Sequence, residues 1–198
     1  MKDLTISTAS AGTQGIDLAS GAGAGAFNAL RVYSANLAAT KSALNAAVAN
    51  AKTNPGDGIF DSGLHASSAI GVAQIADAHG DSMVMARATK LGDLNLDGVV
   101  TISDFIDLAS HFNGAGGWQE GDLNYDGSVT ISDFIDLASN FNTSYTGEVF
   151  PISAEDQKTL SSFAASIGVS VPEPGTMSVI AVGAFGLLLR RGRRRRAL

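Results

Sequence analysis

Apolar residues recur at regular spacing in several parts of this 198-residue chain. Between residues 36 and 53 they form one helical stripe in an alanine-rich segment. Pro55 and its neighbouring glycines end the pattern, so a helix is expected there. The segment that follows is mixed, with one predicted strand at residues 82–89. A capping pattern from Ser153 predicts a short helix that ends near Ile167.

The most regular pattern is a repeat. A 22-residue segment that begins at Gly92 recurs from Gly121, 29 residues later, with 19 of its 22 positions identical. Each copy is a loop rich in Asp, Asn and Gly, followed by apolar residues at helical spacing. One such helix cannot bury its apolar stripe alone. We therefore expect the two copies to pack their helices together about a pseudo-two-fold axis.

Each loop carries oxygen-bearing side chains at positions 1, 3, 5 and 12 and a glycine at position 6, the spacing of an EF-hand-type calcium loop. The carbonyl of position 7 and the threonine of position 9 would complete the oxygen set. Because position 12 is Asp rather than the longer Glu, we expect dissociation constants on the order of 10⁻⁵ to 10⁻³ M. The alternative is that both loops are only polar turns that cap two helices. The expected ligands of two Ca²⁺ ions are Asp93, Asn95, Asp97, Val99, Thr101 and Asp104 in the first loop, and Asp122, Asn124, Asp126, Ser128, Thr130 and Asp133 in the second.

This motif, the missing leading helices and the tandem arrangement resemble a type I dockerin over about 50 of the 198 residues. The resemblance implies a module that folds on calcium and docks onto a cohesin-like partner, typically to tether carbohydrate-active enzymes. The duplication would then permit two equivalent docking orientations. By this resemblance the partner contacts would be Ile102, Ser103, Ala109 and Ser110, with Ile131, Ser132, Ala138 and Ser139 in the second copy.

The C-terminal residues 171–198 resemble a PEP-CTERM sorting signal. They combine the motif Pro172-Glu173-Pro174, an apolar run that ends at Leu189, and six arginines within the last nine positions. The resemblance implies that an exosortase processes the chain near the Pro-Glu-Pro motif. As a helix the 14 residues 176–189 span about 21 Å, which is short for a hydrocarbon core of about 30 Å. We expect a single transmembrane helix that holds an inner-membrane precursor, with the arginines cytoplasmic, before release to the surface or outside. An uncut tail anchor is the alternative.

Charge and composition narrow the function classes. The six tail arginines leave 7 basic against 19 acidic residues in the rest of the chain, a balance that argues against nucleic acid as a partner. The absence of cysteine excludes disulfides and thiolate chemistry. The start shows no signal peptide, so we expect a C-terminal fragment or a late start. The segment before the repeats loosely resembles planctomycete-type surface proteins.

Together these patterns predict a mainly α fold in the recognisable part, with an N-terminal region of uncertain fold that holds short β pieces and one helix. The expected divisions are a β-rich end or linker (1–35), a helix with a connecting segment (36–90), the calcium repeats (91–143), a linker with a short helix (144–170) and the sorting signal (171–198). Trp118 is expected to pack against the two repeat helices, with a sugar-stacking role as the alternative.

The function expected from these observations is a non-catalytic calcium-binding attachment or assembly module of an exported surface protein, with a possible link to polysaccharide binding or breakdown. No catalytic residues are identified. One alternative is the C-terminal part of a secreted glycoside hydrolase whose catalytic domain lies upstream. Another is a calcium-locked spacer without a cohesin partner.

Overall fold

The computed structural model describes residues 15–18, 29–64, 68–146 and 149–169. The described residues up to Ser153 form one compact unit, and those from Ala154 onward form a second. The described elements of the first unit are β1 (Gly15–Asp17), β2 (Ala29–Val32), α1 (Leu37–Thr53), β3 (Gly58–Phe60), β4 (Ser68–Ala76), β5 (Ser82–Lys90), α2 (Ile102–His111), the 3₁₀ helix η1 (Trp118–Glu120) and α3 (Ile131–Ser139); the second unit holds α4 (Ala154–Ser166).

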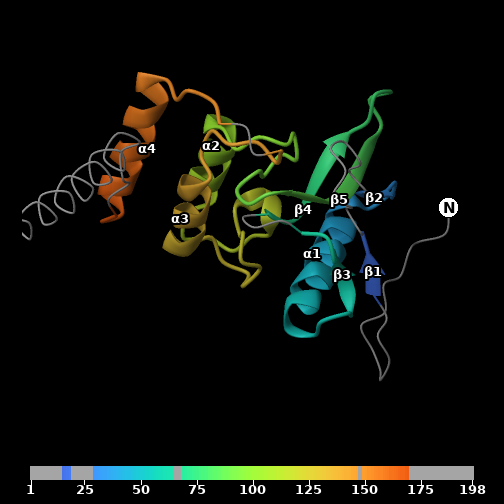
Figure 1. Ribbon diagram of the computed structural model, residues 1–198. Helices are drawn as coiled ribbons and strands as arrows, with labels where there is room; N and C mark the ends of the chain where they lie inside the picture. Colours follow the sequence, from blue (N-terminus) through green and yellow to red (C-terminus); the bar gives the residue numbers. More distant parts are fainter. Residues whose placement is uncertain (1–14, 19–28, 65–67, 147–148, 170–198) are drawn as a thin grey trace, which may run out of the picture. The chain divides into compact units, whose positions relative to one another are not determined.

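Residues 15–90 contain a three-stranded antiparallel sheet of order β2-β5-β4 (Figure 1). The strands β4 and β5 form a hairpin whose register runs from Ser68 opposite Lys90 to Ala76 opposite Ser82. Strands β1 and β3 form a separate parallel pair. Helix α1 packs against β3, β4 and β5 through the buried stripe that the sequence predicts. We call this assembly of residues 15–90 the N-terminal layer.

The repeats pack against the N-terminal layer at strand β4. A Cβ atom added to Gly71 would lie 2.5 Å from Leu96 Cδ2 and 2.6 Å from Trp118 Nε1, so only glycine fits this contact. Helix α1 also holds η1, because Lys41 pairs with Glu120 and the Trp118 N–H donates to Asn45 Oδ1 at 3.4 Å. The linker between the two copies is thereby fixed to the N-terminal layer.

The expectation of a mainly α fold is wrong. The described residues form a mixed α/β structure in which the loop-helix units lie against a sheet rather than forming a self-contained helical pair. Strand β4 escaped prediction because its sequence, SAIGVAQIA, is rich in Ala and Gly, which carry little β preference. Within the described residues, no helix has the length and apolar character needed to cross a bilayer. The expected transmembrane helix and sorting signal lie outside the described residues.

Candidate metal sites

The first loop, residues 93–104, wraps its backbone around its own acidic side chains. Both carboxylate oxygens of Asp93 accept backbone hydrogen bonds, from the N–H of Asp97 at 3.1 Å and of Gly98 at 2.9 Å. The Asn95 side-chain oxygen accepts from Asp97 N–H at 2.8 Å, and Asp97 Oδ1 accepts from Val99 N–H at 2.9 Å. The side chains at positions 1, 3 and 5, which the sequence predicts as ligands, therefore hold the loop backbone in one tight turn.

The second loop, residues 122–133, repeats this network 29 positions later. The Asp122 carboxylate accepts from the N–H groups of Asp126 at 3.0 Å and Gly127 at 2.9 Å. Position 4 adopts a left-handed backbone in both loops, with φ of +63° at Leu96 and +61° at Tyr125. Nearly identical loop sequences thus give the same left-handed position 4 and the same backbone hydrogen bonds to position 1.

The Asp at position 12 closes each loop from the following helix. Asp104 lies in the first turn of α2, where its Oδ2 accepts from Thr101 N–H at 2.8 Å in a capping box. Its Oδ1 accepts from Leu94 N–H at 2.9 Å and so reaches the start of the loop. Asp133 makes the equivalent bonds to Thr130 and Leu123 at 2.9 Å each. Position 9 is therefore the helix cap, and position 12 faces position 1 across the loop.

The two copies contact each other reciprocally. Val99 at position 7 of the first loop bridges to Ser144 after the second helix, and Ser128 at position 7 of the second loop bridges to Ala115 after the first helix. Phe105 and Phe134, which also occupy equivalent positions, meet edge to face with ring centres 6.1 Å apart. Each of these contacts maps onto its counterpart, or onto itself, when every residue is exchanged for the one 29 positions away in the chain, which describes a pseudo-two-fold axis between α2 and α3.

The position-1 and position-12 carboxylates are buried in both loops. Asp93, Asp104 and Asp133 are 0 % exposed and Asp122 is 2 % exposed. Burial raises the pKa of Asp93 to about 6, and burial also raises the pKa of Asp104 and Asp122. In the described part of the chain, none of the four forms an ion pair with Lys, Arg or His. Buried carboxylates cost several kcal/mol unless a cation compensates them, so this donor set suits a hard divalent cation.

The third acidic side chain of each loop stands apart from the buried pair. Asp97 and Asp126 are exposed at the loop surface. Accordingly, the described residues contain no group of three or more His, Cys, Asp or Glu side chains gathered closely enough to hold a metal ion. Coordination by these loops would therefore require Asp97 and Asp126, together with amide and carbonyl oxygens, to join the two buried carboxylates.

The residues expected to contact a partner lie on the outer side of α2 and α3. Ser103, Ser110, Ile131, Ser132 and Ser139 are exposed, and Ile102, Ala109 and Ala138 are half-buried. Sequence reasoning missed two larger apolar side chains at equivalent positions on this surface, Ile106 with 56 % exposure and Ile135 with 45 %. The sequence offers a signal for them: at helical spacing they fall beside, and not within, the stripe of buried phenylalanines and leucines on each helix.

Three residues connect the loops to the N-terminal layer. Thr89 and Trp118 lie outside the two loops, and Tyr125 is a loop residue that differs between the copies. Trp118 is fully buried, and its Nε1–H donates to the Asp93 carbonyl at 2.7 Å, which leaves no face for sugar stacking. The Thr89 hydroxyl donates to Asp93 Oδ2. Tyr125 donates its hydroxyl to the Ile70 carbonyl at 2.6 Å and stacks on Trp118. The sequence shows that Thr89 and Trp118 are 29 residues apart, but it gives no sign that both donate hydrogen bonds to Asp93.

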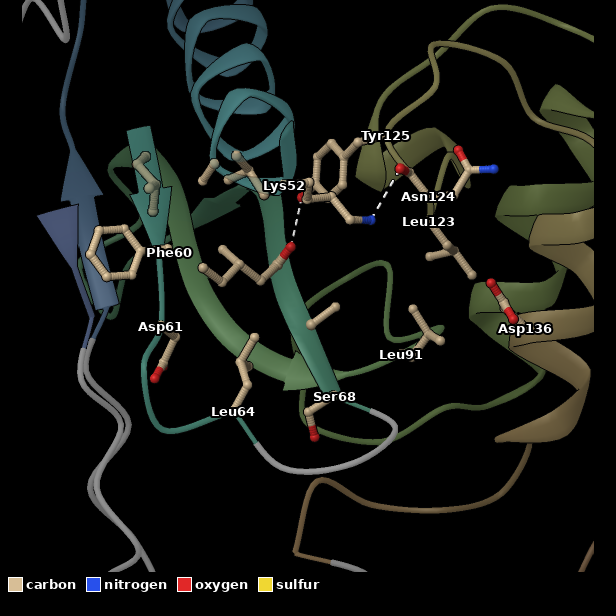
Figure 2. A pocket seen from close by; sticks show the side chains of 15 residues that line it. Lys52, Phe60, Asp61, Leu64, Ser68, Leu91, Leu123, Asn124, Tyr125 and Asp136 are labelled. Carbon is tan, nitrogen blue, oxygen red and sulfur yellow. Dashed lines mark hydrogen bonds between the residues drawn. The ribbon is translucent and has the colours of Figure 1, made fainter. Parts of the chain in front are cut away.

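A cavity of about 370 Å³ lies where the second loop meets the N-terminal layer (Figure 2). Its walls are mostly apolar side chains of α1, β3 and β4, with Leu123 and Tyr125 from the second loop. Lys52 Nζ crosses the junction to the Asn124 carbonyl at 3.0 Å and lies 5.3 Å from the centre of the Tyr125 ring. The cavity is therefore bounded by the contacts that attach the second loop.

Residues 170–195 match the family model of the PEP-CTERM protein-sorting motif. This motif marks an exported cell-envelope protein that an exosortase recognises and processes. It includes the Pro172-Glu173-Pro174 sequence and lies outside the residues that the structure describes. No curated protein and no solved structure matches the chain. The comparisons thus support the sorting signal and give no support to the resemblance to dockerins.

Proposed function

We propose that residues 92–142 form a tandem calcium-binding module that stabilises an exported, exosortase-sorted protein and serves in attachment rather than catalysis. One observation carries the proposal. Each loop buries a pair of carboxylates, at positions 1 and 12, that form no ion pair with a basic side chain of the described residues. Each loop also carries an Asn side-chain oxygen at position 3 and a backbone carbonyl at position 7, which are kinds of oxygen that Ca²⁺ prefers. The same arrangement occurs twice, related by a pseudo-two-fold axis.

Calcium would be held by the side chains at positions 1, 3, 5 and 12 and by the carbonyl at position 7. Its chemistry here is structural, because it offsets the charge of buried carboxylates and links each loop to the helix that follows it. An ion at about 100 times its dissociation constant adds about 2.7 kcal/mol of folding free energy for each site. A compartment outside the cytoplasm suits the weak binding that an Asp at position 12 implies.

The test is a calcium titration of the full chain by calorimetry, with Trp118 fluorescence as a local signal because it is the one tryptophan in the sequence. We expect two ions per chain and a rise in melting temperature on calcium addition. The Asp93→Ala/Asp122→Ala double variant should lose both effects. Asp107→Asn, which removes one charge from the exposed face of α2, is the matched control and should retain them. A wild-type chain that releases no binding heat and melts equally in EDTA and calcium would refute the proposal.

Attachment is favoured over a second candidate, a calcium-locked spacer, by the exposed isoleucines Ile106, Ile131 and Ile135 on α2 and α3. The contact of the second loop with the N-terminal layer favours the spacer. A pull-down from envelope extracts separates the two. A protein captured with calcium, lost with EDTA and lost again in Ile106→Ser/Ile135→Ser supports attachment. No captured protein, or only capture that is unchanged both by EDTA and by Ile106→Ser/Ile135→Ser, supports the spacer.

A further inference from the structure

Two residues that precede the two copies by the same distance both contact one aspartate. Thr89 lies four residues before Asp93, and Trp118 lies four residues before Asp122. Instead of each serving its own loop, both donate to Asp93: the Thr89 hydroxyl to Oδ2, and the Trp118 indole N–H to the carbonyl at 2.7 Å. All three residues are 0 % exposed. The side chain and the main chain of Asp93 are thus both anchored from outside the first loop.

The second loop lacks this support. In the described part of the chain, the Asp122 carboxylate accepts only the N–H groups of Asp126 and Gly127 from its own loop. The residue at the Thr89 position is Trp118, whose indole points to the other copy. The two loops have identical ligand side chains at positions 1, 3, 5, 9 and 12, yet their first carboxylates are held differently.

We infer that Thr89 is a positioning residue for the first calcium loop and that it makes the first loop the tighter of the two. This inference rests on the proposed calcium function. The hydroxyl holds the Asp93 carboxylate in one rotamer before an ion arrives and stabilises its ionised form, so less conformational freedom is lost on binding. Groups that orient a metal ligand in this way typically change affinity by about 10- to 100-fold.

Two substitutions distinguish a positioning role of Thr89 from a packing role. Its side chain supplies one hydroxyl and one methyl group in a buried site. Thr89→Val keeps the volume and removes the hydroxyl, whereas Thr89→Ser keeps the hydroxyl and removes the methyl group. A positioning role therefore predicts that Ser rescues calcium binding and Val does not. A packing role predicts the reverse order.

The experiment uses the full chain in an Asp122→Ala background, so that the first loop titrates alone, and in the wild-type background, where both loops titrate. Calcium binding is followed by calorimetry, and Trp118 fluorescence reports the first loop. With Asp122→Ala, we expect Thr89→Val to weaken binding by at least about 10-fold and Thr89→Ser to stay within about threefold of Thr89. In the wild-type background, we expect the first loop to bind calcium more tightly than the second, and Thr89→Val should make the two affinities equal or reverse their order.

The outcomes separate the two claims. Two equal sites in the wild-type chain, a Thr89→Val affinity equal to that of Thr89, or a Thr89→Ser variant as weak as Val would each overturn the role of Thr89 while leaving the calcium module intact. A wild-type chain that binds no calcium overturns the proposed function itself. Thermal melts in EDTA identify a variant that has not folded, and the Ser variant then decides the question alone.

Discussion

The two copies of the repeat have nearly the same sequence and the same internal hydrogen bonds, but they meet the rest of the molecule through different residues. The first loop is anchored at its first residue, by Thr89 and Trp118. The second is anchored at its third and fourth residues, where Lys52 binds the Asn124 carbonyl and Tyr125 reaches Ile70. Repetition therefore preserves the local geometry of the loop, while its surroundings give each copy a separate attachment.

The two attachments differ because the pseudo-two-fold pair of copies packs against the N-terminal layer, which has no two-fold symmetry. The N-terminal layer offers strand β5, which runs directly into the first loop, and it offers α1 and β4 to the second. One pair of residues that differs between the copies, Leu96 and Tyr125, lies at this junction. A second pair that differs, Val99 and Ser128, instead forms bridges between the copies, to Ser144 and Ala115 respectively.

The largest expected effect comes from the contact that the copies share. Phe105 and Phe134 are 3 % and 0 % exposed and touch across the pseudo-two-fold axis. Changing either to Ala should lower the free energy of unfolding by about 3–5 kcal/mol. The double variant should cost less than the sum, because both residues lose the same contact. Urea unfolding at saturating calcium measures all three values. A cost below about 1 kcal/mol for one ring beside a full cost for the other would contradict an equal sharing of the core.

A smaller effect should follow when the second copy is made like the first. Tyr125→Leu removes the hydrogen bond to the Ile70 carbonyl and the ring stacked on Trp118. The loss should be about 2 kcal/mol in the free energy of unfolding. Amide exchange should accelerate in β4 more than in α2. Tyr125→Phe separates the two contributions by removing the hydroxyl alone.

The reverse exchange tests whether the attachments are interchangeable. Leu96 is 5 % exposed and faces Gly71 of β4, so Leu96→Tyr should overfill this site and cost about 1–3 kcal/mol. Unfolding by urea, with Tyr33→Phe as a control at an exposed hydroxyl, measures the cost. If the double variant Leu96→Tyr/Tyr125→Leu had the wild-type free energy of unfolding, the two attachment sites would be interchangeable and the proposed asymmetry would be wrong.

The sequence allowed prediction of the parts that depend on local pattern. Helix α1, strand β5, helix α4 and both helices of the repeat occur where their periodicity placed them. The turns around Asp93 and Asp122 also follow from local chemistry, because Asp and Asn side chains accept from nearby backbone N–H groups. These elements needed no knowledge of distant residues.

The parts that could not be predicted depend on pairing between distant segments. Strand β4 is held by its hairpin with β5 and by Leu96 and Trp118 at Gly71, and its own residues give a weak signal. Trp118 was expected against the two repeat helices. Its 3₁₀ helix η1 does contact α2, but its indole N–H bonds to Asp93 and its ring lies at Gly71 of β4. A buried side chain selects its partner in three dimensions, which periodicity does not encode.

The smallest expected effect tests whether the side chain at position 7 matters. Ser128 is exposed, and its N–H donates to Asp126 Oδ1 at 2.9 Å, as Val99 N–H does to Asp97 in the first loop. Because the carbonyl would bind calcium, Ser128→Val should change the free energy of unfolding by less than about 0.5 kcal/mol. The affinity of the second loop should also change little, as calorimetry on the full chain can establish. A tenfold change from this substitution would mean that the side chain, and not only the backbone, distinguishes the two loops. The difference between the copies would then lie inside the loops rather than in what holds them.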